Sequence, residues 1–225
     1  MSDMQTITAI KPTLRDPTRW SIKVGRKFVG ALPQTEIDEL GLKVGTPWTA
    51  QLMQRVDQAA QYDKIYRSAM FRIGRRMYST SDLAKKLKMS KYQPTQEIVT
   101  QVIEKCQSMG LLDDQAYGRA LIHDIQLSKP AGPRLLQSKL MQKGLDRSLI
   151  EQLIRETEED RDDFEAAMGL AQKKWKSLTQ LPMQKARQRL YGQLVRRGFE
   201  MSTISRVMEN LDWDSLADAA EDEWA

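Results

Sequence analysis

The sequence predicts a mainly α-helical protein in which three tandem three-helix repeats follow a small N-terminal segment containing a β-hairpin. The first observation behind this prediction is an internal repeat at a constant offset of 54 residues. The positions Leu136, Leu140, Gly144, Leu145, Ile150 and Ile154 recur as Leu190, Leu194, Gly198, Phe199, Ile204 and Met208. Leucines four residues apart lie on one face of a helix, and a following glycine commonly ends that helix. Each copy is therefore expected to be a helix, a glycine stop and a second helix.

A looser third copy upstream is the second observation. Leu83 and Leu87 are followed by Ile98 and Val102, again four residues apart, and counting one preceding helix for each pair gives three units of three helices. Units this small cannot bury their apolar stripes alone, so neighbours must stack, and we expect an elongated, curved array. The predicted divisions are a β-rich extension over residues 1–50, the start of a linking helix over 51–63, repeats over 64–113, 114–160 and 161–211, and an acidic tail over 212–225.

The first fifty residues differ from the rest because they contain strand patterns. Apolar and polar side chains alternate over residues 6–10 and again over residues 20–24. Gly25-Arg26 then separates the second strand from residues 27–29, and a glycine at the first position of a two-residue loop suits a type II′ hairpin. A short helix over residues 35–40, ended by Gly41, and a linking helix from about residue 49 to residue 77 complete the predicted N-terminal part.

Helix starts and stops are frequent within the repeats. Asp113 and Asp114 are adjacent carboxylates, a pattern that also occurs in catalytic pairs. They stand at the beginning of a predicted helix, however, where carboxylates stabilise the free amides, so we assign them to capping. Pro133 suits the first turn of the next helix, and Gly110 and Gly144 end the helices that precede them.

Charge is strongly segregated along the 225 residues, although the net charge is only +5. Residues 64–145 hold 15 Lys and Arg against 6 Asp and Glu, residues 173–206 hold 9 against 1, and residues 207–225 hold none against 7. Two basic segments of this size predict attraction to nucleic acid or to an acidic protein. For any single cluster, a solvated helix face is an equally good interpretation.

Several function classes are disfavoured by what the sequence lacks. Cys106 is the only cysteine, so no intramolecular disulfide can form, and a reducing cytoplasm is the expected compartment. No signal peptide and no apolar run of membrane-spanning length is present. A phosphate-binding glycine loop, a Cys/His metal cluster and a nucleophile elbow are also missing, so we expect no cofactor, no metal and no enzymatic activity.

Basic residues on or beside the repeated helices are the candidate contacts with a partner or with DNA. Arg197 matches Lys143 at the 54-residue offset, so two repeats place positive charge at the same position. Lys129 and Arg134 bracket Gly132, close to a helix start whose free amides could hold a phosphate. We assign Gly132 a role in backbone conformation and Arg134 a role in contact with a partner or with DNA. The full candidate set is Arg72, Arg75, Arg76, Lys85, Lys86, Lys129, Arg134, Lys139, Lys143, Arg196 and Arg197.

Trp175 stands among three lysines and could therefore stack on a nucleic-acid base between cations. Large aromatic residues at helical spacing are more often part of a core, and Leu170 and Ala171 place this one on an apolar face. We therefore predict that Trp175 packs inside its repeat.

Four motifs follow one another along the chain. They are Leu83 and Leu87 after a serine-rich cap, Gly110-Leu111-Leu112-Asp113-Asp114 with Ala116-Tyr117, Gly132 followed by Leu136, Leu140 and Gly144, and Arg196-Arg197-Gly198-Phe199. Their order and spacing resemble those of the RecX family, bacterial regulators of the RecA recombinase. The resemblance covers about residues 64–211, and the segment before residue 50 resembles an N-terminal extension that some members carry.

The resemblance implies a regulator, and not an enzyme, that binds RecA filaments on single-stranded DNA and modulates ATP hydrolysis, strand exchange and induction of the DNA-damage response. We expect weak, salt-dependent binding to single-stranded DNA, with double-stranded DNA left open, a monomeric chain and no membrane association. Two alternatives also stay open. One is a helix-turn-helix-like regulator that acts directly on DNA, and the other is a helical adaptor for an unrelated protein.

Overall fold

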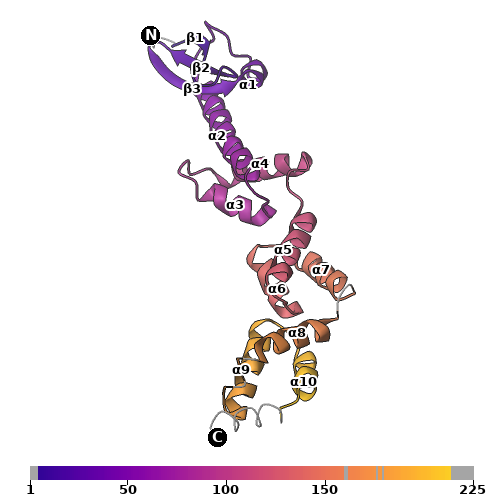
Figure 1. The fold of residues 1–225 in the computed structure, drawn as a ribbon. Helices are drawn as coiled ribbons and strands as arrows, with labels where there is room; N and C mark the ends of the chain where they lie inside the picture. The colour runs from indigo at the N-terminus through magenta and orange to yellow at the C-terminus, as the bar shows by residue number, and fades with distance from the viewer. Residues whose placement is uncertain (1–4, 160–161, 176, 179, 214–225) are drawn as a thin grey trace. The chain divides into compact units, whose positions relative to one another are not determined.

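A computed structural model of the chain describes residues 5–159, 162–175, 177–178 and 180–213 (Figure 1). It is mainly helical, with ten helices and one small antiparallel sheet among these residues, as the sequence predicts. The chain divides into two compact units. One contains the residues up to Tyr78 together with Asp82–Leu112, and the other contains Ser79–Ser81 together with the residues from Asp113 onward. Residues 214–225, which make up most of the predicted acidic tail, lie outside the described part.

The N-terminal sheet has the strand order β1-β2-β3, with every neighbouring pair antiparallel. Its strands are β1 (Ile7–Pro12), β2 (Arg19–Val24) and β3 (Lys27–Pro33). Val24 pairs with Lys27, so Gly25-Arg26 forms the predicted two-residue loop, and Gly25 has the positive φ of +58° that this turn requires at its first position. β3 continues beyond the predicted residue 29 because it pairs with β2 along its whole length.

Two helices follow the sheet, α1 (Gln34–Glu39) and the long α2 (Ala50–Ile73). The hydroxyl of Thr49 caps α2 by accepting a hydrogen bond from the backbone N of Leu52 at 3.2 Å. The first half of α2 packs against the sheet and its second half packs into the first repeat, so one helix belongs to two hydrophobic clusters. α2 ends before the predicted residue 77, and Gly74, a poor helix former, follows it.

The first repeat consists of the second half of α2 with α3 (Thr80–Lys88) and α4 (Gln96–Ser108). Leu83 and Leu87 of α3 are fully buried in one cluster with Ile98, Val102 and Cys106 of α4. The residues that are four positions apart in the sequence of this copy are thus the residues that form its core. Burial also raises the pKa of the Cys106 thiol, which keeps the sulfur protonated and unreactive.

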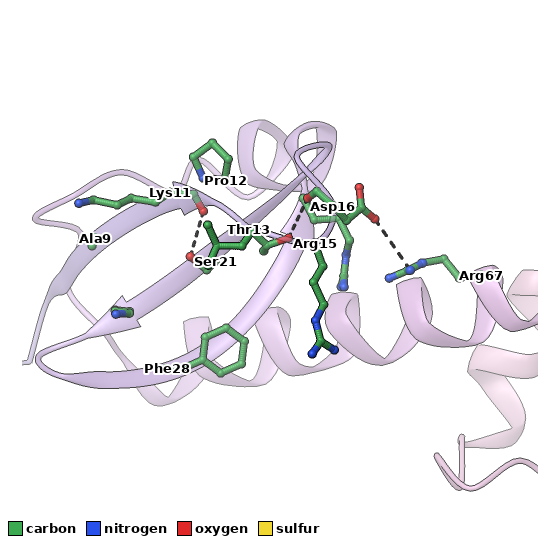
Figure 2. Close-up of a pocket in the computed structure, with 12 residues that line it drawn as sticks. Ala9, Lys11, Pro12, Thr13, Arg15, Asp16, Ser21, Phe28 and Arg67 are labelled. Carbon is green, nitrogen blue, oxygen red and sulfur yellow. Dashed lines mark hydrogen bonds and ion pairs between the residues drawn. The ribbon is translucent and has the colours of Figure 1, made fainter.

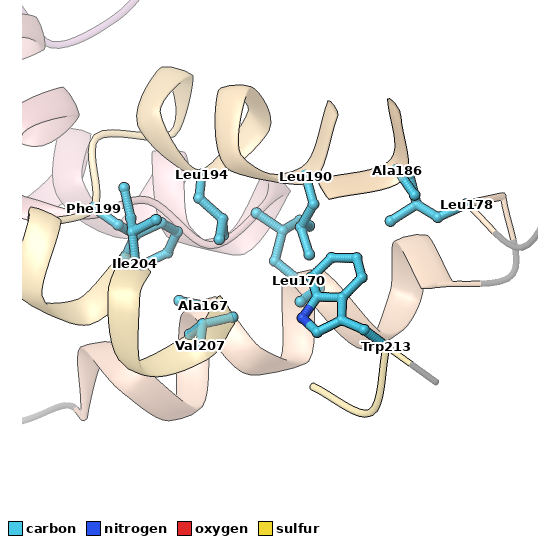
Figure 3. Close-up of a cluster of buried hydrophobic side chains, with 11 residues drawn as sticks. Ala167, Leu170, Leu178, Ala186, Leu190, Leu194, Phe199, Ile204, Val207 and Trp213 are labelled. Carbon is cyan, nitrogen blue, oxygen red and sulfur yellow. The ribbon is translucent and has the colours of Figure 1, made fainter. Parts of the chain in front are cut away.

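The second repeat consists of α5 (Asp114–Ser128), α6 (Pro133–Gln142) and α7 (Arg147–Glu159), and the third of α8 (Asp163–Trp175), α9 (Met183–Arg196) and α10 (Met201–Glu209). Their cores correspond, because Leu140 is buried in the second repeat as Leu194 is in the third (Figure 3). Gly144 and Gly198 have φ values of +71° and +77°, the left-handed conformation of a glycine helix stop. The 54-residue repeat in the sequence is therefore one structural unit used twice.

Trp175 belongs to the core of the third repeat. It is half-buried, packs against the cluster that contains Leu170 and Ala171, and has its ring centroid 5.3 Å from that of Trp213. The ring is therefore engaged in packing, as predicted, and does not project as a stacking platform.

Candidate partner-binding surface

The second and third repeats meet where α6 begins and α9 ends. The backbone N of Gly132 donates a hydrogen bond to the carbonyl O of Arg197 at 2.8 Å, and the N of Arg134 donates to the carbonyl O of Gly198 at 3.1 Å. The first amides and the last carbonyls of a helix have no partner inside their own helix. Each helix end therefore satisfies the other. We call this backbone contact, formed by Gly132, Arg134, Arg197 and Gly198, the repeat joint.

The repeat joint requires glycine on both sides. A Cβ atom on Gly132 would lie 2.4 Å from the carbonyl O of Gly198, and a Cβ atom on Gly198 would lie 2.2 Å from the backbone N of Leu135. Both distances are well below van der Waals contact, and the obstructing atoms belong to the backbone, so they cannot rotate away. Gly198 also has a positive φ that residues with a side chain rarely adopt.

The same contact bears on phosphate binding at the start of α6, where free amides could hold a phosphate between Lys129 and Arg134. The amides of Gly132 and Arg134 are not free, because they already donate to the carbonyls of Arg197 and Gly198. This agrees with the assignment of Gly132 to backbone conformation. An anion that binds here must therefore be held by side chains.

Arg134 carries an ion pair across the repeat joint. Its Nε and Nη2 atoms donate to the two carboxylate oxygens of Glu200 at 2.9 and 2.8 Å, a bidentate geometry. This carboxylate raises the pKa of Arg134 above its ordinary value, and the pair remains open to solvent. Glu200 directly precedes α10, but its side chain makes no capping hydrogen bond, which leaves the carboxylate for Arg134. The positive charge of Arg134 is thus shared with a neighbour.

Arg197 is held inside the second compact unit by backbone carbonyls. Its Nε donates to the carbonyl O of Pro130 at 2.6 Å, and its Nη2 donates to the carbonyl O of Lys129. The residue is half-buried, and burial lowers the pKa of the guanidinium below its ordinary value. Arg196, one position earlier, is exposed. The two adjacent arginines therefore have different environments, although they look equivalent in the sequence.

Lys143 also has a structural contact at its backbone. The hydroxyl of Ser79 donates to the carbonyl O of Lys143 at 2.6 Å, and Ser79 directly precedes α3. Arg197 occupies the matching position of the next copy, and its carbonyl O accepts the bond from Gly132. In both copies, the carbonyl at this position accepts a hydrogen bond from the start of a helix earlier in the chain. The backbone carbonyls of Lys143 and Arg197 thus have a packing role, in addition to any role of the two charged side chains.

The carboxylates of Asp113 and Asp114 are bonded to backbone amides. Oδ1 of Asp113 accepts hydrogen bonds from the N atoms of Gln115 and Ala116, both at 2.9 Å. Oδ1 of Asp114 accepts a hydrogen bond from the N of Thr80 at 2.7 Å. These are capping interactions at the starts of α5 and α3, and they engage one oxygen of each carboxylate.

Arginines near the end of α2 lie over aromatic rings in the first unit. The Cζ atom of Arg75 lies 4.9 Å from the ring centroid of Phe71, and that of Arg76 lies 4.1 Å from the ring centroid of Tyr78. Hydrogen bonds from Arg76 and Arg72 lower the pKa of Tyr78 below its ordinary value of 10.0. Arg72 is half-buried, whereas Arg75 and Arg76 are exposed. These cations are therefore partly engaged with the rings beneath them.

Other predicted residues project into solvent. None of them forms an ion pair with a carboxylate in the part of the chain that the structure describes. They are Lys85, Lys86, Lys129, Lys139 and Arg196. Lys129 and Arg134 flank Gly132 in the second repeat, and Arg196 directly precedes Arg197 in the third, so all three border the repeat joint along the chain. We call Lys129, Arg134 and Arg196 the joint surface.

Spacing in the sequence could not reveal the partners of these cations. Glu200 is 66 residues from Arg134, and the carbonyls that hold Arg197 leave no trace in the identity of a side chain. A second pairing that the sequence did not reveal joins Arg19 of β2 to Asp63 of α2, with Nη2 and Oδ2 2.6 Å apart. Each pairing depends on helices or strands that meet only in the folded chain.

Within the described ranges, no group of three or more His, Cys, Asp or Glu side chains is placed to hold a metal ion. No helix in those ranges combines the length and the apolar character needed to cross a membrane.

Comparison with known proteins places the last two repeats in a family. The profile of the third three-helix domain of RecX matches residues 160–208, and the profile of the second matches residues 113–154. The regulatory protein RecX of Staphylococcus aureus strain JH9 is 24% identical over 213 residues, which cover 93% of this chain and 76% of that protein. The protein of the same name from strain Newman matches equally well.

Two solved structures share the fold. A crystal structure of a regulatory protein RecX has a TM-score of 0.74 at 22% identity and covers 92% of this chain and 100% of its own. The crystal structure of RecX from Lactobacillus salivarius has a TM-score of 0.59 at 18% identity, with coverage of 68% and 97%. Fold and repeat joint together define a protein built from tandem three-helix domains. Its second and third repeats match three-helix domains of the RecX family.

Proposed function

We propose that this protein regulates the RecA recombinase by binding filaments of RecA on single-stranded DNA. Similarity to a family of regulatory proteins supports a regulatory role. The observation that carries the proposal is the joint surface, a set of exposed cations from two repeats that border one backbone contact along the chain. Because a RecA–DNA filament presents phosphates and acidic side chains at regular intervals, a paired cationic surface suits it.

Multivalent contact explains how such a chain would act. A filament repeats the same groups along its length, so a chain with several cationic repeats meets several equivalent sites. The repeat joint fixes two repeats to each other, which makes the second contact intramolecular once the first has formed. We propose that the bound chain bridges neighbouring RecA protomers and restricts the motions that ATP turnover needs. Slower ATP hydrolysis, strand exchange and damage-response induction follow.

Direct contact with DNA is proposed to be weak and electrostatic. Exposed lysine and arginine side chains neutralise phosphates and release counterions, so the affinity falls steeply as salt rises. This applies to single-stranded and double-stranded DNA alike. A helix-turn-helix-like regulator would instead bind a particular duplex sequence tightly, and an adaptor for an unrelated protein would leave RecA unaffected.

The test measures ATP hydrolysis by RecA on single-stranded DNA while the full-length protein is titrated into the reaction. We expect the wild-type protein to inhibit, and the double variant Lys129→Glu/Arg196→Glu to inhibit at least severalfold more weakly. The matched control is Lys173→Glu/Lys174→Glu, which makes the same charge change at exposed positions of α8. No effect of the wild-type protein at severalfold excess over RecA would refute the RecA proposal, and equal inhibition by both double variants would refute the role of the joint surface.

Charge reversal is a sharper test than truncation of the third repeat. A chain that ends near residue 160 lacks the carbonyls of Arg197 and Gly198, so it leaves the amides of Gly132 and Arg134 without their partners. Loss of inhibition could then reflect a damaged second repeat.

The acidic C-terminal segment is proposed to compete with anionic partners for the basic surfaces. Residues 207–225 carry seven acidic and no basic side chains, directly after a segment with nine basic and one acidic. Deletion of residues 214–225, which keeps the buried Trp213 of the third repeat in place, should therefore raise the affinity for a short DNA duplex at low salt. An unchanged affinity would favour a passive role for the segment.

A further inference from the structure

We propose that the outer face of the N-terminal sheet binds single-stranded nucleic acid, with a base stacked on Phe28 and phosphates held by Lys11, Arg15 and Lys23. This contact is additional to the one proposed for the helical repeats. It lies in the first compact unit and would operate in the absence of RecA.

Strand register determines which side chains share the outer face. Ile22 and Val24 of β2 point into the hydrophobic cluster beneath the sheet, so Ser21 and Lys23 point the other way. Lys23 pairs with Phe28 of β3 on one side and with Ala9 of β1 on the other. Residues directly opposite each other on neighbouring strands project from the same face. Phe28 and Lys23 therefore leave the same face of the sheet from adjacent positions.

Phe28 is an aromatic side chain that the fold leaves uncovered. It is 58% exposed, and it lines a pocket of about 660 Å³ together with Ala9 and Ser21 (Figure 2). Small side chains at these two positions leave open space beside the ring. A flat, accessible ring on a sheet surface is the group on which proteins stack unpaired bases.

The pocket is strongly cationic. Its lining contains five basic residues and one acidic residue, Asp16. Asp16 accepts a hydrogen bond from the hydroxyl of Thr18 at 2.5 Å and lies 3.8 Å from Arg67, and Arg19 is paired with Asp63. These four charged groups are thus engaged with one another or with neighbouring groups of the fold.

Three cations remain on the pocket wall. Lys11, Arg15 and Lys23 are exposed, and none of them forms an ion pair with a carboxylate in the described ranges. Lys11 lies opposite Ser21, whose hydroxyl donates to the carbonyl O of Lys11 at 2.9 Å, so the Lys11 backbone is fixed beside β2 (Figure 2). Several cations beside an exposed ring suit a single strand, in which bases and phosphates alternate.

Single-stranded nucleic acid suits this face better than a nucleic-acid duplex or an acidic protein surface. In a duplex the bases are stacked on one another and are not available to a ring on a flat sheet. An acidic protein surface would use the lysines but would gain little from a phenyl ring surrounded by cations. The ring and the cations together therefore favour an unpaired strand.

The first experiment measures binding of the full-length protein to a fluorescein-labelled dT12 oligonucleotide by anisotropy, in low salt and without RecA. Phe28→Ala should weaken binding about tenfold, because the stacking of one base on an aromatic ring raises the affinity by about that factor. Lys23→Glu should weaken it severalfold and reduce the salt dependence. The matched controls are Val44→Ala and Lys43→Glu, which change exposed residues of the same compact unit outside the pocket.

The second experiment locates the contact directly. A dT12 oligonucleotide carrying 5-iododeoxyuridine is cross-linked to the wild-type protein by ultraviolet light, and the cross-linked peptides are identified by mass spectrometry. We expect a cross-link at Phe28 and its disappearance in Phe28→Ala, with the circular dichroism spectrum unchanged. Cross-links confined to the helical repeats would refute the proposal. So would a loss of RecA inhibition in Phe28→Ala with unchanged dT12 affinity, because that result would assign the face to protein contact.

Discussion

Gly132 and Gly198 lie in direct backbone contact, and this contact joins the second three-helix repeat to the third. The carbonyl O of Gly198 accepts a hydrogen bond from the N of Arg134, while the N of Gly132 donates to the carbonyl O of Arg197. Neither glycine has room for a Cβ atom. Lys129 and Arg196 are near neighbours of this contact in the sequence, so we expect the stability of the joint and the arrangement of the proposed binding surface to be coupled.

Replacing either glycine of the joint should destabilise the protein. We expect Gly132→Ala and Gly198→Ala each to lower the free energy of unfolding by about 2 kcal/mol or more, because the new methyl group overlaps backbone atoms. Gly169→Ala on α8 is the control, since a Cβ there meets nothing within 4 Å, and helix propensity should make it slightly stabilising. Urea unfolding followed by far-ultraviolet circular dichroism measures the difference. Equal stability of all three variants would contradict the joint.

Arg196 and Arg197 should separate a binding role from a structural one. Arg197→Met removes two charge-assisted hydrogen bonds to carbonyls, so we expect a loss of about 2 kcal/mol in the free energy of unfolding. Arg196→Met removes an exposed charge and should change stability by less than about 0.5 kcal/mol while weakening inhibition of RecA. Thermal unfolding together with the RecA ATPase assay distinguishes the two. A destabilised Arg196→Met protein with normal inhibition would reverse this assignment.

Glu200 should weaken the binding of anionic partners to the joint surface. Glu200→Gln removes the carboxylate that pairs with Arg134, which frees the guanidinium for an anionic partner. We therefore expect severalfold tighter binding to single-stranded DNA in low salt and stronger inhibition of RecA. Glu151→Gln makes the same change in an exposed pair with Arg147 on α7 and serves as the control. If both variants gain equally, net charge alone accounts for the effect and the pairing with Arg134 plays no part.

Tyr78 should ionise at a lower pH than an ordinary tyrosine. Arg76 and Arg72 donate hydrogen bonds that lower its pKa in the folded protein. The folded state then binds fewer protons than the unfolded state between the two pKa values. The contribution of Tyr78 to stability is accordingly full above the unfolded pKa of about 10 and is lost as the pH falls through the folded value.

Absorbance at 295 nm during an alkaline titration measures this ionisation, and Tyr78→Phe identifies its amplitude. We expect Arg76→Met to move the pKa of Tyr78 back upward, because it removes the largest cause of the shift. Arg75→Met is the control, since Arg75 lies over Phe71 instead. A titration curve that is identical for Arg76→Met and the wild type would show that Arg76 has no such influence.

Local periodicity was sufficient to predict the helical repeats and their cores. Leu140 and Leu194 are buried because residues four apart share a helix face, and Gly144 and Gly198 end helices because glycine adopts positive φ. The hairpin at Gly25 follows from the same kind of rule. Each of these features depends on residues within a few positions of one another, so the sequence alone determined them.

Only the tertiary structure decided which charged and aromatic side chains remain available to a partner. Arg197 is held by carbonyls and Arg134 is shared with Glu200, whereas the adjacent Arg196 is exposed. Trp175 is packed, while Phe28 projects beside Lys23. These outcomes depend on groups that are distant in sequence and meet only when helices and strands pack. A pattern along the chain records the period of an element, but it does not record which neighbour will satisfy or cover each side chain.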